Sequence, residues 1–271
     1  MKNNLIAFDM DGVLVDVSGS YRATARQTAR LFFQDAAGAS ELPDPLFSLA
    51  DLSRVKQSGG LNNDWDLTYL VVNLLFSCVD CPQYSRTTDA WQLYRETIPR
   101  CDIAPLAHML KSTGRPLTEL LKSKGQPDHD LVRRLRTGDV GSGNIIKQIF
   151  QEIYLGRELF ASTYRIPAEK HRAAGYIDRE KLMVEKALLA GLAEDNILAV
   201  ATGRPRAEAD YALDHFGLRS YFSHVLTLDD CLREEKKFFD QKGRCVSLSK
   251  PHSFMLDAIA AASPAVAGRL Y

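Results

Sequence analysis

The sequence predicts an α/β protein in which a parallel sheet is interrupted by a large helical insertion. Short apolar runs of strand length lie near both ends of the chain and alternate with helical patterns, which implies a parallel sheet. The long region between them lacks a strong alternating strand and is mainly helical in pattern. The 271 residues are 45% hydrophobic and 25% charged, as in globular proteins. We expect a sheet domain at residues 1–16 and 175–271 and a helical cap at residues 17–174.

Local patterns then predict the individual elements in chain order. The first strand is the apolar run at residues 5–8, and helices are expected in the insertion at residues 20–33, 66–76, 89–97, 106–110, 117–121 and from 145 onward. Asp178 is predicted to cap a helix that carries Leu182, Leu188, Leu189 and Leu192. The remaining elements are a strand at 197–201, a helix ending before Gly217, a strand at 224–228 and a helix at 251–262.

Composition argues against several classes of protein. Lys and Arg together number 34, as do Asp and Glu, so the basic excess of a general nucleic-acid binder is absent. No apolar run approaches the roughly 18 residues that span a bilayer. Asp9 and Asp11 interrupt the only apolar run near the N-terminus, which excludes a signal peptide there. The odd count of five cysteines argues against a disulfide framework. We therefore expect a cytoplasmic protein with no nucleic-acid or membrane partner.

Two acidic residues directly follow the first strand. Asp9 and Asp11 are two positions apart, so in an extended chain their carboxylates project to the same side. Ligands of open α/β sheets bind at the carboxyl ends of the strands. Like charges side by side are unfavourable unless a cation or a shared proton compensates them, and Gly12 can turn the chain away with a positive φ. The arrangement indicates a divalent-metal site with one carboxylate free to attack.

Three segments carry a family resemblance. The stretch Asp-Met-Asp-Gly-Val-Leu-Val-Asp at residues 9–16 resembles the first motif of the haloacid dehalogenase (HAD) superfamily. Residues 199–205, Ala-Val-Ala-Thr-Gly-Arg-Pro, resemble its second motif, and Lys250-Pro251 resembles its third. A helical cap between the first two motifs is similar to the subfamily IA branch, which includes phosphoglycolate phosphatase. The resemblance implies a Rossmann-like core with a helical type 1 cap.

The resemblance also implies a chemistry, namely Mg²⁺-dependent hydrolysis of a small phosphorylated metabolite through an aspartyl-phosphate. Asp9 would be the nucleophile and, with Asp11, would hold the Mg²⁺ cofactor. Asp11 would also act as the general acid and base. Thr202 would hold the phosphate at a strand end, and Lys250 would offset the negative charge. Gly203 and Arg204 would also contact the phosphate. The polar, glycine-bearing stretch at residues 56–64, with Lys56, Asn62 and Asn63, is either a substrate-selecting loop or an ordinary connection between helices.

One expected motif is missing. The family's fourth, acidic motif should follow the helix after Lys250, and the sequence shows no such segment before it stops. This favours a fragment of a longer protein, or a strand supplied by another chain or by a second copy, and it predicts weak metal binding and low activity. Two alternatives stay open: a catalytically impaired or non-catalytic homologue that binds a phosphorylated ligand or a partner, and a phosphomutase.

Overall fold

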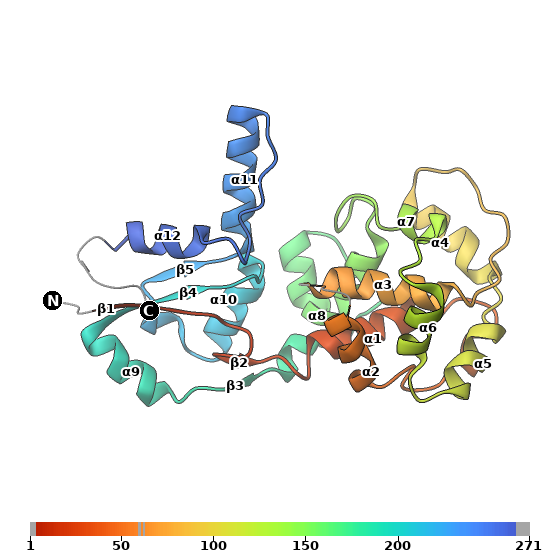
Figure 1. Cartoon of the computed structure of the whole chain (residues 1–271), viewed down its shortest axis with the longest axis horizontal. Coiled ribbons are helices and arrows are strands. Elements are labelled where there is room, and N and C mark those ends of the chain that lie inside the picture. Colours follow the sequence, from red (N-terminus) through yellow and green to blue (C-terminus); the bar gives the residue numbers. More distant parts are fainter. Residues whose placement is uncertain (1–3, 59–60, 62, 264–271) are drawn as a thin grey trace. The chain divides into compact units, whose positions relative to one another are not determined.

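The chain divides into two compact units, each of which is described here by itself (Figure 1). The structure is a computed structural model that describes residues 4–58, 61 and 63–263. The sheet unit consists of Met1–Val17 and Glu180–Tyr271, and the inserted unit consists of Ser18–Arg179. The sequence set the corresponding limits at residues 16 and 175, within five residues of these.

A parallel sheet forms the centre of the sheet unit, as the alternating pattern predicted. Within the described residues its strands, in spatial order, are β1 (Asn4–Phe8), β4 (Asn196–Ala201) and β5 (His224–Leu226). β1 and β4 are parallel, with Asn4 opposite Asn196 and Phe8 opposite Val200. The carboxyl ends of these two neighbouring strands therefore lie at the same edge of the sheet.

Helices cover both faces of this sheet: α9 (Lys186–Asp195), α10 (Arg206–His215), α11 (Leu228–Lys242) and α12 (Phe254–Ala261). Alternate side chains of a strand point to opposite faces. Leu198 and Val200 of β4 accordingly pack in one apolar cluster with residues of α9 and α10. Ala199 and Ala201 pack in a second cluster with residues of α11 and α12. In Figure 1, α9 and α12 lie on opposite sides of the sheet.

The prediction of a helix that starts at Asp178 is wrong for the residues before Lys186. Leu182 lies instead in a two-stranded antiparallel ribbon, formed by β2 (Val15–Asp16) and β3 (Lys181–Leu182). α9 begins only at Lys186, after Glu185 at its N-cap. The predicted helical spacing of the leucines holds from Leu188 onward. Leu182 departs from it because it pairs across the ribbon with Val15, which is distant in sequence.

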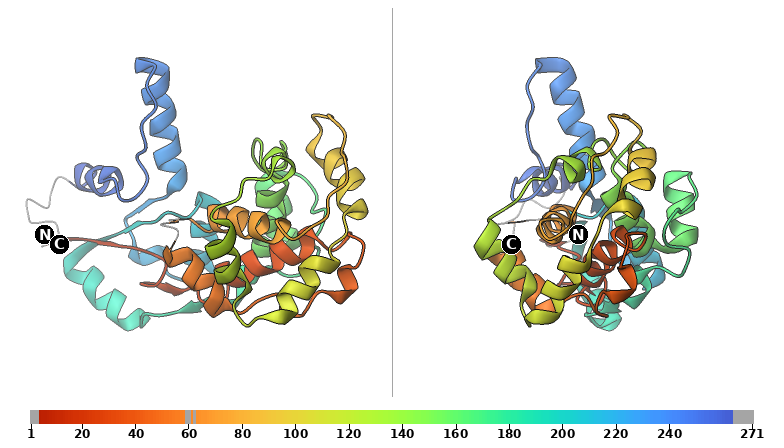
Figure 2. Two further views of the ribbon diagram at one scale, coloured as in Figure 1. Left: turned by 45° about the vertical axis from the view of Figure 1, so that its right-hand side comes forward. Right: turned by 90° about the vertical axis from the view of Figure 1, so that its right-hand side faces the viewer.

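α11 was not predicted from the sequence. Its fifteen residues are mostly charged, and Asp230 and Cys231 are its buried residues. Thr227 and Asp230 form a capping box at its N-terminus, and Gly243 ends it with a φ of 63°. Figure 2 shows α11 extending away from the sheet, with the following segment running back alongside it. A helix that buries so few side chains gives only a weak apolar signal in sequence.

The inserted unit is helical, as predicted. Its helices are α1 (Tyr21–Phe32), α2 (Leu49–Ser58), α3 (Asp64–Phe76), α4 (Ala90–Thr97), α5 (Ala104–Ser112), α6 (Pro116–Lys124), α7 (Asp130–Arg134) and α8 (Ile145–Tyr164). Short 3-10 segments are η1 (Ala39–Glu41), η2 (Ile98–Arg100) and η3 (Tyr176–Arg179) here, and η4 (Arg219–Tyr221) in the sheet unit. The side chains of Asn63, Asp89 and Asn144 accept backbone N–H groups at the starts of α3, α4 and α8. α1 packs against both α3 and α8 and so forms the centre of this unit.

Candidate active site

A tight turn places Asp9 and Asp11 directly after β1. The backbone N–H groups of Leu14 and Val15 both donate to the carbonyl of Met10 at 2.9 Å. The Met10 and Leu14 side chains are fully buried and anchor the turn in the core. Gly12 adopts a φ of 74°, which other residues reach only with strain. The turn therefore follows from local sequence, and it leaves the two carboxylates at the strand end.

The nearest cation to Asp9 is the residue predicted from the third motif. Lys250 Nζ lies 2.8 Å from Asp9 Oδ1, and the backbone N–H of Met10 donates to the same oxygen at 2.7 Å. Both side chains are half-exposed, at 44% for Asp9 and 41% for Lys250. Lys250 lies shortly before α12 and 241 positions after Asp9, so the fold brings together two residues that the sequence linked only by motif order. Asp9 remains open to solvent and to an incoming substrate.

Thr202 and Gly203 follow the neighbouring strand. Thr202 is buried, and its N–H donates to the carbonyl of Leu226 on β5 at 3.0 Å. Its hydroxyl accepts the N–H of Arg204 at 3.2 Å, which fixes the turn before α10. Gly203 is exposed. Asp9 comes one residue after Phe8, and Thr202 comes two residues after its partner Val200, so the two predicted residues lie at adjacent strand ends.

The Arg204 side chain is fully buried and joins two acids. Its Nε donates to Asp11 Oδ1 at 2.6 Å, and its Nη2 lies 2.9 Å from Glu180 Oε2. The Glu180 side chain is 1% exposed, whereas that of Asp11 is 36% exposed. Desolvating these charges is unfavourable, and close pairing compensates it. Glu180 stands outside every motif and was not predicted, and the only sequence signal for it is an acid near the domain boundary.

The two acidic residues have different cationic partners within the protein. Their i, i+2 spacing predicted that both carboxylates would point to a common cation. In the structure Asp9 pairs with Lys250, while Asp11 pairs with Arg204. Gly12 and the turn end the extended conformation soon after β1, and a cation shared by Asp9 and Asp11 stays a prediction.

The acids after β5 stabilise helix starts. Asp229 Oδ2 accepts the N–H of Arg206 at 2.6 Å, and Asp230 Oδ2 accepts the N–H of Thr227 at 2.8 Å. Arg206 and Arg233 also pair with Asp230, each at 2.6 Å. Burial tends to raise the pKa of the Asp230 carboxyl, but the bonds from Thr227, Arg233 and Arg206 outweigh it and hold this pKa below its usual range. Asp229 and Asp230 therefore serve the caps of α10 and α11.

The predicted substrate-selecting residues belong to the inserted unit. Lys56 Nζ lies 2.9 Å from Asp64 Oδ1. The Asn63 side chain accepts the N–H of Asp66 at 2.7 Å and thereby caps α3. Asn62 lies outside the described residues. Each of the two described side chains therefore has a local partner within its own unit.

Magnesium in proteins commonly keeps several waters and binds one or two carboxylates together with substrate phosphate. The half-exposed Asp9 carboxylate fits such a site. The described part of the chain contains no group of three or more His, Cys, Asp or Glu side chains placed to hold a metal ion. The Asp9 carboxylate is thus the group on which a fit to Mg²⁺ rests. Among the same residues, no helix is long and apolar enough to cross a bilayer.

One solved structure supports the fold. A structural-genomics target of the Northeast consortium is 20% identical and aligns with a TM-score of 0.62 over 96% of this chain and 77% of that one. The phosphatase Tt82 from Thermococcus thioreducens is 16% identical and aligns with a TM-score of 0.49 over 94% of this chain and 98% of that one.

Comparison of sequences gives one relative and one family. An imidazoleglycerol-phosphate dehydratase of Phytophthora nicotianae is 34% identical over 106 residues, which are 37% of this chain. The match spans only 21% of that relative's own length. The model of the haloacid dehalogenase-like hydrolases matches residues 4–238, which contain Asp9, Asp11 and Thr202. A match over this much of the chain, on a parallel sheet with acids at its first strand end, means that the protein belongs to the haloacid dehalogenase-like hydrolase family.

Proposed function

We propose that the chain is a Mg²⁺-dependent phosphatase that hydrolyses a small phosphorylated metabolite through an aspartyl-phosphate. The observation that carries this proposal is the half-exposed Asp9 carboxylate, held 2.8 Å from Lys250 at the end of β1 and beside Thr202 at the end of β4. Phosphoryl transfer needs chiefly positioning and neutralisation of charge. A nucleophilic carboxylate, a cation and a hydroxyl at one sheet edge supply these.

Each residue of the site has its own role in the proposed reaction. An Asp9 oxygen attacks phosphorus, and the bond from phosphorus to the leaving alkoxide breaks while Asp11 gives that alkoxide a proton. Asp11 then takes a proton from a water molecule that attacks the acyl-phosphate, which releases inorganic phosphate and restores Asp9. Thr202 and the N–H of Gly203 hold the phosphate, and Lys250 offsets its charge. Mg²⁺ held by Asp9 and Asp11 would supply further neutralisation of the phosphate.

Arg204 takes a different role from the phosphate contact that its motif suggested. Its side chain is fully buried, and its Nε is bonded to Asp11. We assign it to positioning the Asp11 carboxylate, with Glu180 balancing its charge. The proposed substrate contacts of Lys56, Asn62 and Asn63, the cytoplasmic location, and a strand supplied by another chain stay predictions of the sequence.

Hydrolysis of p-nitrophenyl phosphate tests the proposal. We expect turnover by the purified chain with Mg²⁺ and loss of turnover with EDTA. Asp9→Asn should abolish turnover, and it should also abolish the gain of one phosphoryl group on the peptide containing residue 9 after acid quenching. Asp195→Asn is the matched control, because Asp195 is exposed and precedes the opposite end of β4. Full activity of Asp9→Asn would contradict the nucleophile.

The ion pair between Arg204 and Asp11 favours one alternative, an impaired enzyme that binds a phosphorylated ligand without turning it over. A carboxylate fixed by a buried guanidinium is a poorer proton donor than a free one. In that case the chain would bind phosphate with Mg²⁺ and yet hydrolyse nothing. Appearance of phosphate on a second hydroxyl of a sugar phosphate would instead identify a phosphomutase.

A further inference from the structure

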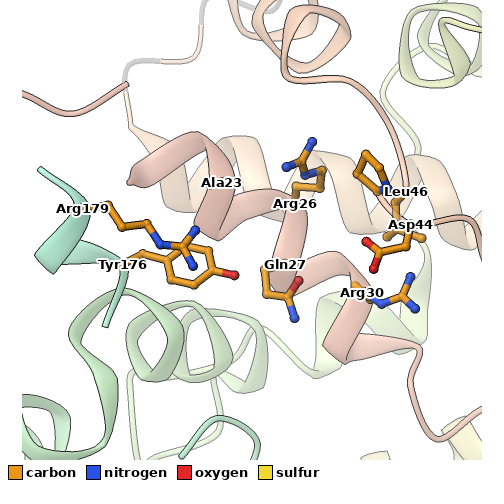
Figure 3. Close-up of a pocket in the computed structure, with 9 residues that line it drawn as sticks. Ala23, Arg26, Gln27, Arg30, Asp44, Leu46, Tyr176 and Arg179 are labelled. Carbon is orange, nitrogen blue, oxygen red and sulfur yellow. The ribbon is translucent and has the colours of Figure 1, made fainter. Parts of the chain in front are cut away.

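A polar pocket of about 270 Å³ lies wholly within the inserted unit (Figure 3). One side is formed by α1, which contributes Ala23, Arg26, Gln27 and Arg30. The other sides are formed by Asp44, Pro45 and Leu46, and by Tyr176 and Arg179 of η3. Three segments distant in sequence therefore meet around one cavity, which no motif of the sequence marked.

The pocket has an excess of positive charge. Its walls contain three guanidinium groups, on Arg26, Arg30 and Arg179, and a single carboxylate, on Asp44. Among the described residues, no carboxylate forms an ion pair with any of these three arginines. Other arginines in the described chain, such as Arg219, pair with one or two acids. Arg26 and Arg30 are moreover one helical turn apart, where like charges repel. The fold therefore keeps a local repulsion that an anion would relieve.

The guanidinium groups are held in place by uncharged contacts. Arg26 Nη1 donates to the carbonyl of Phe47 at 3.1 Å, and Arg30 Nη1 donates to the carbonyl of Pro43 at 2.9 Å. The Arg179 guanidinium carbon lies 3.3 Å from the centre of the Tyr176 ring. Each guanidinium has five N–H donors, so these contacts use a small share of them. The remaining donors are preorganised for a further acceptor, which lowers the entropy lost on binding.

We propose that this pocket is a binding site for a phosphate-type anion, namely inorganic phosphate or the phosphate group of a small metabolite. Planar guanidinium forks match phosphate oxygens in pairs. The Gln27 amide and the Tyr176 hydroxyl add neutral donors to the same walls. The volume lies just below that of pockets for drug-sized ligands, which suits a compact anion. The site is separate from Asp9 and Lys250, which belong to the other unit.

Calorimetric titration with pyrophosphate, in EDTA so that no Mg²⁺-dependent turnover intervenes, tests the proposal. We expect one site on the wild-type chain and a loss of affinity of about tenfold or more in the double variant R26Q/R30Q. Arg22→Gln is the matched control, because Arg22 is an exposed arginine of α1 that does not line the pocket. It should bind as the wild type does. Citrate, a carboxylate anion of similar charge, should bind more weakly than pyrophosphate.

Arg26 and Arg30 also bind the carbonyls of Phe47 and Pro43, so lost binding in R26Q/R30Q has to be distinguished from misfolding. A second variant makes this distinction. Arg179→Gln removes an exposed guanidinium that stacks on the Tyr176 ring, and it should lower affinity severalfold with an unchanged circular dichroism spectrum. The double variant T202A/K250A should keep the site. No binding by the wild type, equal binding by R26Q/R30Q, tighter binding of citrate, or loss of binding only in T202A/K250A would each overturn the proposal. None of these outcomes depends on whether Asp9 is a nucleophile.

Discussion

Arg204 donates a hydrogen bond from Nε to Asp11 Oδ1 at 2.6 Å, although the two residues are 193 positions apart in sequence. The arginine side chain is inaccessible to solvent, whereas the aspartate side chain is 36% exposed. A buried guanidinium fixes its partner because any movement would leave a charge unpaired in a low-dielectric environment. The bond thus couples the interior of the sheet unit to the proposed acid–base group.

Replacing Arg204 should lower both stability and activity. Arg204→Met removes the cation that pairs with the buried Glu180, and breaking such a pair costs about 3–5 kcal/mol. The double variant R204M/E180M should recover much of that loss, because no buried charge is left unpaired. Urea unfolding of the wild type and of the single and double variants gives the coupling energy. For the fraction still folded, kcat should fall while KM changes little. A loss of stability below about 1 kcal/mol would contradict the structural role of the pair.

Asp230 should make the sheet unit sensitive to acid. Its pKa in the folded state is lowered from the usual 3.8, so its contribution is fully present above pH 3.8 and is lost as the pH falls through the lower folded value. Asp230→Asn should cost about 1–3 kcal/mol at pH 7 and should flatten the decline of stability below pH 3.8. Unfolding by urea from pH 7 to pH 2 measures both effects. Asp240→Asn, an exposed residue of the same helix, should leave the pH profile unchanged.

A glycine inside α8 should tolerate no side chain. Gly156 has a φ of 72°, and a Cβ there would lie 2.3 Å from the backbone nitrogen of Gly175. Gly156→Ala should therefore destabilise the inserted unit by about 2–4 kcal/mol. Gly191→Ala is the opposite case, because Gly191 lies within α9 and a Cβ there meets nothing within 4 Å. It should stabilise by about 0.5–1 kcal/mol. Thermal unfolding of the two variants should thus shift in opposite directions.

Glu152 should be essential to the inserted unit. It is fully buried on α8, and its carboxylate accepts the backbone N–H groups of Glu169, Lys170 and His171 at 3.0, 2.6 and 3.1 Å. Glu152→Gln replaces one acceptor oxygen with an amide that faces N–H donors, at a cost of about 2–3 kcal/mol. Hydrogen exchange at residues 169–171 should quicken. Glu158→Gln, an exposed position on the same helix, should leave exchange there unchanged.

Much of the fold follows from neighbouring residues in the sequence. The strand at residues 5–8, the helix of the inserted unit after Asn144 and the helix ending before Gly217 were predicted within about one residue of the structure. Alternation of apolar residues, side-chain caps and glycine stops act over a few positions, so sequence alone displays them. The same local reasoning failed at Leu182, whose conformation depends on pairing with Val15.

The sequence by itself determined that the chain alternates strands and helices, that acids follow the first strand, and that a hydroxyl and a lysine follow in motif order. Only the tertiary structure decided which cation each acid meets, since Asp9 pairs with Lys250 and Asp11 with Arg204. Tertiary structure also paired Glu180 with Arg204 and assembled the arginine-lined pocket from segments that include α1 and η3. Such contacts join residues that are distant in sequence, and their geometry is set by packing and by the need to pair buried charge, neither of which a local pattern records.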